Sequence, residues 1–481
     1  MKDIAIIAVG GYNEIGRNMT AIRIGKDIVV MDMGIRLDRV QIHEDTDVES
    51  LHAADLINMG AIPDDSIMQN VDGKVRAIAC THGHLDHIGA ISKLAHKYHA
   101  PIIASPFTAD LINQEIKSEK IFGVNNPLNI MNAGERFAVT EDIELEFIRV
   151  QHSIVDCVFA AIHTPKGIIV YANDFKIDRS PTLGEPPDFA RLRALGKQGV
   201  LALITETTNA SISGKTPSEK IAKDLVWDVL IGTEESKAGV MVTTFSSHIA
   251  RIRAIIEAAH KMGRKPVLLG RSMEKYWGTA VRTGYAQQNE VAVFGRRKSV
   301  DKALKRIMSD GKDKYLPIMT GHQGEPGAIL SRVANGETDY LVESGDRVIF
   351  SAGIIPQPLN ESNRHTVVTK LKMRGGRIYD NVHVSGHACR EDHWELLRMI
   401  QPEHVIPSHG NLISHGSYLM MAEETGYSLG SNIHLVRNGQ ELLSIWWMRG
   451  ERGCGQPCCF WQGRPPVAKM QCWPRLQCPL S

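Results

Sequence analysis

Four metal-ligand side chains lie within one six-residue segment, residues 82–87 (HGHLDH), and they constrain this chain more than any other feature. The preceding residues 75–81 (VRAIACT) have the pattern of a buried strand, and residues 88–98 place apolar side chains at helical spacing. The donors therefore fall on a strand-to-helix turn, where a rigid scaffold can hold an open site. Imidazole and carboxylate groups at this spacing can serve two adjacent divalent ions.

Three further donor residues lie just beyond the ends of predicted strands: His152, Asp174 and His409. Alone, each would more often be a surface or capping residue, but strand ends commonly carry site residues. Together with residues 82–87 they supply enough donors for two metal ions. The predicted ligands are His82, His84, Asp86, His87, His152, Asp174 and His409. Asp32, also at a strand end, is predicted to orient a ligand imidazole.

A binuclear centre of this kind predicts hydrolysis. Two adjacent cations can activate water and neutralise charge that develops on the attacking and leaving oxygens. Phosphodiesters suit such a centre because both oxygens need charge stabilisation. Asp86 is then a ligand whose loss should stop turnover, and an imidazole near the metals could protonate the leaving oxygen.

Residues 383–387 (HVSGH) form the next cluster of polar side chains. Gly386 permits close backbone approach to an anion. Ser385 and the imidazoles of His383 and His387 can donate hydrogen bonds to a phosphate. The alternative is a plain loop with a helix cap, and the residues alone leave both interpretations open.

Residues 244–248 (TFSSH) precede a helix predicted at 248–262. Hydroxyl groups at a helix N-terminus can bind phosphate, or they can only cap the helix. Capping is the commoner outcome. Ser246 and Ser247 are therefore candidates for phosphate binding, and the alternative stays open.

The chain has 481 residues, which predicts two domains, and its net charge of +1 indicates no global affinity for a polyanion. Basic stretches at 296–306 and 370–377 could bind a polyanion locally or be solvated faces. No run of 18 apolar residues and no signal peptide is visible, so we expect no membrane contact and a cytoplasmic location. The cysteines before residue 450 suggest no disulfide framework, which fits a reducing compartment.

The pattern of predicted strands and helices changes twice along the chain. The first third is rich in strands and turns, and from about residue 217 long helical patterns alternate with short apolar strands, as in a parallel α/β sheet. After about residue 355 the earlier strand–turn–helix style returns and ends in a predicted hairpin at 434–446. We therefore predict one domain inserted into another. The predicted segments are 1–209 and 355–448 for the first domain, 210–354 for the insert, and 449–481 for a tail.

The tail, residues 449–481, is rich in cysteine and proline and shows no periodicity. A small zinc-binding appendage is one interpretation, but the cysteine spacing fits no regular ligand pattern. The favoured interpretation is a disordered or non-native extension.

With these residues in view, the chain resembles a known family. Residues 82–87 with His152, Asp174 and His409 are similar to the binuclear zinc site of the metallo-β-lactamase fold, and the insert resembles a β-CASP domain. The motifs that resemble the ribonuclease J family are residues 10–18 (GGYNEIGRN), 205–207 (TET), 321–327 (GHQGEPG), 383–387 (HVSGH) and 407–410 (PSHG). The resemblance covers about residues 1–447. It implies an α/β protein: an αββα metallo-β-lactamase sandwich with an inserted parallel-sheet β-CASP domain.

The resemblance also implies roles for individual residues. One zinc ion would be held by His82, His84 and His152, the other by Asp86, His87 and His409, and Asp174 would bridge them. Glu206 is similar to the acidic motif of the family and would support His387 as proton donor or phosphate contact. The residues that would bind the RNA 5′ phosphate are His383, Ser385, Gly386, His387, Ser246 and Ser247. Mn²⁺ or Mg²⁺ could substitute for zinc.

The activity that the resemblance implies is 5′-to-3′ exoribonuclease action on single-stranded RNA, with a preference for 5′-monophosphate ends and sometimes endonuclease activity. Asn411 and the long acidic stretch 36–72 depart from bacterial members and point to the archaeal branch. These departures put the bacterial mode of oligomerisation in doubt, and we expect a homodimer.

Three other functions compete with this prediction. One is an RNA 3′-end-processing endonuclease of the polyadenylation-factor type, against which the absence of an RNA-binding module before the first strand argues weakly. A small-ester or thioester hydrolase is disfavoured by the helical insert and by HVSGH. A metal-stabilised RNA-binding scaffold is disfavoured by the complete donor set.

Overall fold

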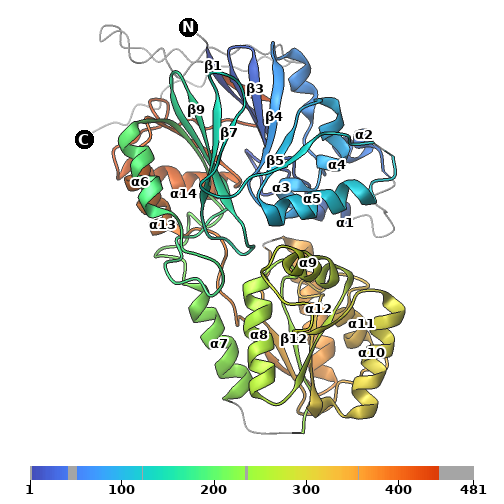
Figure 1. The fold of residues 1–481 in the computed structure, drawn as a ribbon. Helices are drawn as coiled ribbons and strands as arrows, with labels where there is room; N and C mark the ends of the chain where they lie inside the picture. Colours follow the sequence, from blue (N-terminus) through green and yellow to red (C-terminus); the bar gives the residue numbers. More distant parts are fainter. Residues whose placement is uncertain (1–2, 42–50, 122, 233–236, 356, 444–481) are drawn as a thin grey trace, which may run out of the picture. The chain divides into compact units, whose positions relative to one another are not determined.

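The computed structural model describes residues 3–41, 51–121, 123–232, 237–355 and 357–443, which contain three β-sheets (Figure 1). The predictions made for residues 449–481 lie outside the described residues. Two of the sheets belong to the part of the chain that holds the predicted metal ligands, and the third belongs to the insert. Among the described helices, none has the length and apolar character needed to cross a bilayer.

The first sheet has seven strands. β1, β2 and β3 pair antiparallel, and β3 to β6 pair parallel. All seven residues of β1 are buried, as expected for an apolar strand covered on both faces. In spatial order the strands are β19 (Gln440–Leu443), β1 (Ile4–Gly10), β2 (Met19–Ile24), β3 (Asp27–Met31), β4 (Lys74–Cys80), β5 (Ile102–Ala104) and β6 (Leu128–Ile130).

The position of β19 differs from the prediction for the end of the chain. The sequence predicts that residues 441–446 pair with 434–436 in a local hairpin, of which residues 444–446 lie outside the described residues. Instead β19 pairs antiparallel with β1, more than 400 positions earlier in the chain, and Ile433 makes isolated bridges to Val405 and Leu429. The hairpin prediction is therefore wrong, because an unpaired edge strand of the first sheet offers a longer ladder than the local turn does.

The second sheet has six strands, and the three predicted donors that follow β8, β10 and β18 leave from it. Its strands β10, β11 and β18 run parallel, so their carboxyl ends meet at one edge. In spatial order they are β18 (His404–Ser408), β11 (Val200–Glu206), β10 (Gly167–Ala172), β9 (Val158–Thr164), β8 (Glu144–Arg149) and β7 (Arg136–Ala138).

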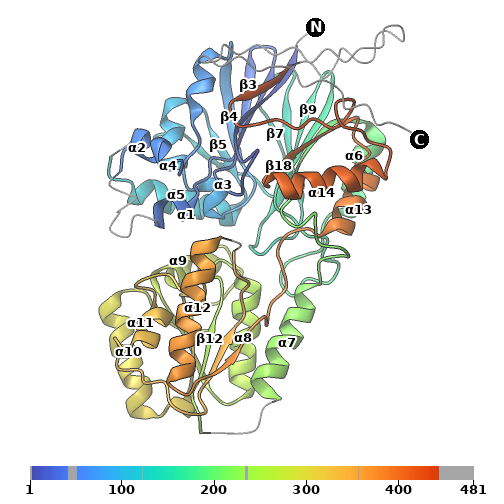
Figure 2. The same ribbon diagram turned by 180° about the vertical axis from the view of Figure 1, so that it is seen from behind.

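Helices cover the outer faces of both sheets and complete an αββα arrangement (Figures 1 and 2). On the side of the first sheet lie α1 (Leu37–Gln41), α2 (Ala53–Asn58), α3 (Leu85–Ile88), α4 (Ile91–Leu94), α5 (Pro106–Ser118) and the 3-10 turns Asp65–Asn70 and Ala95–Lys97. On the side of the second sheet lie α6 (Phe189–Gln198), α13 (Arg390–Ile400) and α14 (Leu412–Glu423). The helical spacing at 88–98 is thus realised as α4 and a 3-10 turn rather than as one helix.

The third sheet is parallel throughout, which confirms the βα alternation predicted for the insert. Its strands are β14 (Ala292–Phe294), β13 (Lys265–Leu269), β15 (Tyr315–Met319), β12 (Val240–Thr243), β16 (Arg347–Phe350) and β17 (Arg377–Tyr379). Its helices are α7 (Glu219–Ile231), α8 (Ile249–Lys261), α9 (Arg271–Arg282), α10 (Arg297–Asp310), α11 (Ile329–Asn335) and α12 (Pro358–Met373), with a 3-10 turn at Lys312–Lys314.

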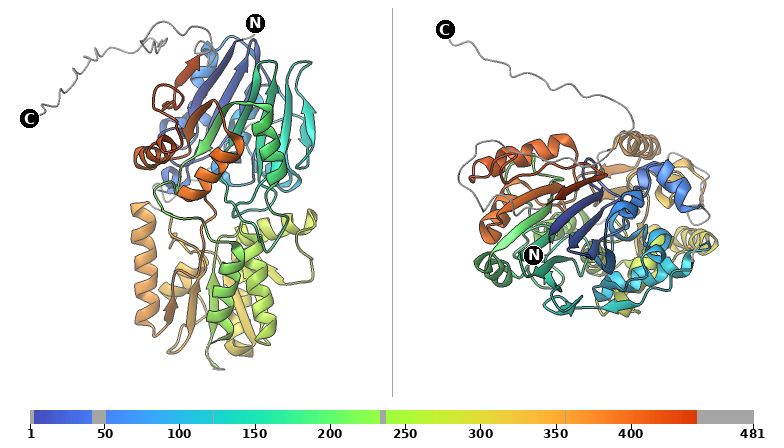
Figure 3. Two further views of the ribbon diagram at one scale, coloured as in Figure 1. Left: turned by 90° about the vertical axis from the view of Figure 1, so that its left-hand side faces the viewer. Right: turned by 90° about the horizontal axis from the view of Figure 1, so that it is seen from above.

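Alternate side chains of the strands in this sheet pack against opposite layers of helices. Val240 and Val242 share a core with α7, α8 and α9, whereas Met241 shares another with α10, α11 and α12. Figure 3 shows helices on both faces of this sheet. Burial on both faces explains why its strands are nearly continuous apolar runs.

β17 lies beyond residue 354, where the sequence analysis places the end of the insert. It nevertheless pairs with β16, and α12 packs on the same sheet. A boundary at 354 would separate these partners, so the pairing favours a boundary after Tyr379. The other domain limits stay predictions.

Candidate metal centre

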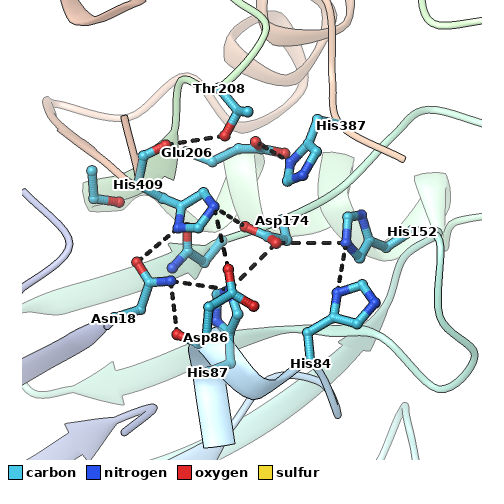
Figure 4. Close-up of polar contacts among 12 residues, drawn as sticks. Asn18, His84, Asp86, His87, His152, Asp174, Glu206, Thr208, His387 and His409 are labelled. Atoms are coloured by element: carbon cyan, nitrogen blue, oxygen red, sulfur yellow. Dashed lines mark hydrogen bonds and ion pairs between the residues drawn. The ribbon is translucent and has the colours of Figure 1, made fainter. Parts of the chain in front are cut away.

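All seven predicted donors come together at one edge of the two sheets that face each other. Figure 4 labels all of them except His82. Residues 82–87 follow β4, His152 follows β8, Asp174 follows β10 and His409 follows β18. Two groups of ligand atoms form, each with all its members within 4.8 Å of one another. The first group is His82, His84, His152 and Asp174, and the second is Asp86, His87, Asp174 and His409.

Asp174 belongs to both groups and lies between them (Figure 4). Its Oδ2 atom is 3.6 Å from His82 Nε2, 3.5 Å from His152 Nε2 and 3.3 Å from His87 Nε2. Its Oδ1 atom is 3.4 Å from His409 Nε2. These separations are longer than hydrogen bonds between well-aligned groups and leave room for a cation between the atoms.

Three residues of the centre have backbones in the left-handed region: Asp32 at φ 57°, Asp174 at φ 43° and His409 at φ 40°. That region is unfavourable for residues other than glycine, and such strain concentrates at functional sites. The strands and the surrounding hydrogen bonds therefore hold these side chains in place against a local preference for other conformations.

The donor set fits divalent metal ions. Asp174 Oδ1 and His409 Nε2 are buried and have no hydrogen-bond partner among the described residues, a rare condition that a bound cation would satisfy. Burial lowers the pKa of His84 to about 4 and keeps the pKa of His82 and of His152 well below its usual value. These imidazoles are neutral at pH 7, which is the form that binds metal.

The second group is rich in negative charge. Burial alone would lower the pKa of His87, but the carboxylates of Asp174, Asp86 and Asp32 outweigh it and raise that pKa well above its usual value. Carboxylates that stabilise a charged imidazole to this degree also stabilise a metal cation at the same place.

Asp32 and Asn18 hold the ligand rings in orientation. Asp32 Oδ2 lies 2.8 Å from His87 Nδ1, and Asp32 Oδ1 accepts a hydrogen bond from the Thr81 backbone. Asn18 Oδ1 accepts from His409 Nδ1 at 2.9 Å, and Asn18 Nδ2 donates to the Asp86 carbonyl. Asp32 is predicted from the sequence and Asn18 is not, because an asparagine in residues 10–18 gives no sign of its distant partner.

We expect Asn18→Ala to lower metal affinity about 10- to 100-fold, the usual effect of losing a group that orients a ligand. The imidazole of His409 would lose the acceptor that fixes its ring. Metal titration of the apoprotein measures the change, with the exposed Asn125→Ala as the matched control. An Asn18→Ala protein with unchanged affinity would contradict this role.

Gly34 is a second residue of the centre that the sequence does not predict. A Cβ atom at this position would lie 1.6 Å from the Asp86 carbonyl oxygen. The neighbouring backbone amides bind the same segment, since Ile35 N donates to Leu85 O and Asn18 N donates to Asp86 O. Only glycine therefore lets this strand end approach the donor turn.

Gly34→Ala is expected to reduce the free energy of unfolding by about 3 kcal/mol and to weaken metal binding, because the donor turn must move away. Gly416→Ala is the opposite control: it lies in α14 with no atom near its Cβ position, so alanine should stabilise by about 0.5–1 kcal/mol. Denaturant unfolding of both variants tests the pair, and equal stabilities would contradict the close approach at Gly34.

Glu206 and His387 form a third group with Asp174. Glu206 ends β11, is fully buried, and its Oε2 atom lies 2.7 Å from His387 Nδ1. Its Oε1 atom accepts from the backbone of Phe175, beside Asp174. Burial opposes protonation of His387, but Glu206 and Asp174 prevail and raise its pKa to about 9.

The predicted phosphate contacts divide into two sets. Ser247 Oγ lies 3.1 Å from His84 Nε2, and the Gly386 carbonyl accepts from His152 Nδ1 at 2.7 Å. Ser385 Oγ accepts from Asn209 and from the His387 backbone. Ser247 and Gly386 thus contact ligands of the centre, and Ser385 contacts His387.

His383 and Ser246 form the second set. His383 Nδ1 is 3.4 Å from the buried guanidinium of Arg251, which also pairs with Glu219. Within the described residues, neither His383 nor Ser246 makes a hydrogen bond or ion pair to the seven donors. α8 begins without a side-chain cap, so the capping interpretation of Ser246 and Ser247 is not seen here.

Family comparisons match three segments of the chain. A family described as "Ribonuclease J, beta-CASP domain" matches residues 237–371. "Zn-dependent metallo-hydrolase RNA specificity domain" matches residues 370–425, and "Beta-lactamase superfamily domain" matches residues 64–188. Together with the three sheets, these matches show a metallo-β-lactamase domain with an inserted β-CASP domain.

Two relatives are similar to this chain over most of their length. Ribonuclease J of Methanocaldococcus jannaschii is 52% identical over 440 residues, covering 91% of this chain and 98% of that protein. Ribonuclease J of Pyrococcus abyssi is 47% identical over 437 residues, covering 91% and 96%. A solved protein of unknown function from Enterococcus faecalis V583 has a TM-score of 0.61 and 16% identity, covers 92% of this chain and 100% of its own, and shows the fold alone.

Proposed function

This chain belongs to the ribonuclease J family, of the archaeal type, and is a metal-dependent ribonuclease; from that premise we propose that it degrades single-stranded RNA from the 5′ end, using two zinc ions and preferring a 5′ monophosphate. The observation that carries the proposal is the meeting of seven donor side chains around the carboxylate of Asp174. A homodimer and a cytoplasmic location remain predictions.

In this proposal each metal ion has its own set of ligands. His82, His84 and His152 would hold one ion, Asp86, His87 and His409 the other, and Asp174 would be shared. When bound, the two ions supply an activated water at neutral pH and neutralise charge on the phosphate.

The protein residues around the ions would position the substrate and move protons. Glu206 fixes the His387 ring through Nδ1, and no hydrogen bond engages His387 Nε2 in the part of the chain that is described. We assign that nitrogen the transfer of a proton to the leaving 3′ oxygen, a task suited to a histidine within reach of the scissile bond. Ser247, Ser385 and the Gly386 backbone would bind phosphate beside the metals, with His383 and Ser246 farther along the RNA.

Product analysis on 5′-labelled, 5′-monophosphorylated RNA tests the proposal. We expect labelled mononucleotide from the first moments, no reaction with a chelator, and recovery on adding zinc. A 5′-triphosphate RNA should react more slowly, and a circular RNA should remain intact.

Other outcomes would contradict specific parts of the proposal. Cutting of the circle with early internal fragments would favour the 3′-end-processing endonuclease. RNA binding without cleavage in zinc or manganese buffer would favour the RNA-binding scaffold. Recovery of activity with manganese but not with zinc would contradict only the choice of metal.

A further inference from the structure

We propose that an exposed basic surface at and beside α10, called here the α10 basic face, binds the backbone of the RNA substrate downstream of the nucleotides that occupy the metal centre. This inference rests on the proposed function and adds a second RNA-binding site. The α10 basic face consists of Arg271, Arg296, Arg297, Lys298, Lys302 and Lys305. Five of these residues lie in the basic stretch 296–306. From the sequence alone that stretch could bind a polyanion or be a solvated face.

The α10 basic face begins at the same edge of the third sheet as the residues that contact the metal centre. Ser247 follows β12 and reaches His84, while Arg271 follows β13 and Arg296 follows β14. All these strands are parallel, so their carboxyl ends share one edge. β14 is three strand positions from β12, or about 15 Å at the usual strand spacing.

The side chains of α10 divide cleanly between the core and the surface. Val300, Ala303, Leu304 and Ile307 are buried against the third sheet. Lys298, Lys302 and Lys305 are exposed and recur at helical spacing on the opposite side. The helix therefore presents a row of cations to solvent, running away from the edge that carries the site.

These cations are not neutralised within the described residues. None of the six side chains has an ion pair or side-chain hydrogen bond there, whereas Arg306 pairs with Asp310. The nearby acidic Asp301 pairs with Arg332, and the exposed Glu274 packs against Gly295. In a chain with a net charge of only +1, this is a local concentration of uncompensated positive charge.

The placement of the charge opposes helix stability. The first turn of α10 contains no acidic residue and begins with Arg297 and Lys298, next to Arg296 at the N-cap. The N-terminal end of a helix dipole is positive, so cations there are unfavourable. Lys370 and Lys372, by contrast, lie in the last turn of α12, where cations stabilise a helix. Helix stability thus explains the α12 stretch and does not explain the α10 basic face.

A row of lysine and arginine side chains fits a phosphate backbone and reads no sequence. A ribonuclease that removes nucleotides from one end must hold RNA of any sequence while the RNA strand advances. The α10 basic face supplies such contacts at a place that an RNA strand leaving the metal centre can reach. Its contribution should therefore depend on RNA length and on salt.

The test compares two triple variants of the metal-loaded enzyme. Lys298→Gln/Lys302→Gln/Lys305→Gln removes three charges from the α10 basic face. Lys370→Gln/Lys372→Gln/Arg377→Gln removes three exposed charges near the end of α12 and the start of β17 and is the matched control. Each enzyme is assayed on a long 5′-monophosphorylated RNA and on one of about four nucleotides, over a range of salt concentrations.

For the α10 variant we expect KM on the long RNA to rise about tenfold with kcat nearly unchanged. The slope of log kcat/KM against log salt should fall by about 2, since each lost phosphate contact on a single strand contributes about 0.7. Cleavage of the short RNA, and both RNAs with the α12 variant, should match the unmodified enzyme.

Two results would overturn the inference: an unchanged KM and salt slope for the long RNA, or an equal loss on the short RNA. The second would mean that the lysines serve the fold or the metal centre. If the unmodified enzyme cleaves neither RNA, the proposed function is contradicted instead, so the two failures are distinguishable.

Discussion

Asp174→Asn is expected to reduce kcat for RNA cleavage by at least about a thousandfold while RNA binding persists. Asparagine keeps the shape of the side chain but removes the negative charge and one oxygen. The carboxylate contributes to both groups of ligand atoms, and its Oδ2 atom lies within 3.6 Å of three imidazoles. Losing it should weaken both metal positions together, whereas Asp86→Ala should stop turnover by disrupting one.

Metal content and single-turnover cleavage, measured on the same preparations, check this result. The matched control is Asp224→Asn on the exposed face of α7, which should change neither. Two equivalents of tightly bound metal in Asp174→Asn, with normal cleavage, would show that the shared carboxylate does not hold the ions.

His387→Ala is expected to lower kcat on RNA about 10²- to 10⁴-fold, the range for loss of a general acid. Metal content should be unchanged, because His387 lies outside the two groups of four ligands. A nucleotide ester with a p-nitrophenolate leaving group needs no proton at the departing oxygen. The variant should therefore retain most of its activity on that ester.

The ester separates the two roles that the histidine could have. If His387 only binds phosphate, cleavage of RNA and of the ester should fall equally, which would contradict proton donation. His365→Ala, an exposed histidine of α12, is the control for general effects of the substitution.

Local chemistry made the donors visible in the sequence. Histidine and aspartate just beyond apolar strands are rare enough as a pattern that residues 82–87 indicated His152, Asp174 and His409 as partners. The same pattern indicated Asp32, because its place at a strand end is a local property. The catalytic roles of these residues stay predictions, although the structure brings the donors within one small volume.

Residues whose function depends on a distant partner showed no such pattern in the sequence. Asn18 is an ordinary polar residue until the fold brings His409, 391 positions away, to its side-chain oxygen. Gly34 resembles any loop glycine until the Asp86 carbonyl lies against it. β17 was likewise missed as part of the insert, because a three-residue strand acquires meaning only from pairing with β16.

The sequence by itself determined the class of this protein: alternating strand and helix patterns, an insert between two parts of one domain, and ligands for divalent metal ions. The tertiary structure alone decided which atoms orient the ligands, which glycine must stay small, and which lysines remain unpaired at the surface. The physical reason is the separation along the chain between the residues that interact. Periodicity and ligand chemistry are carried by neighbours along the chain, whereas hydrogen-bond geometry, close packing and charge neutralisation depend on residues that only folding brings together.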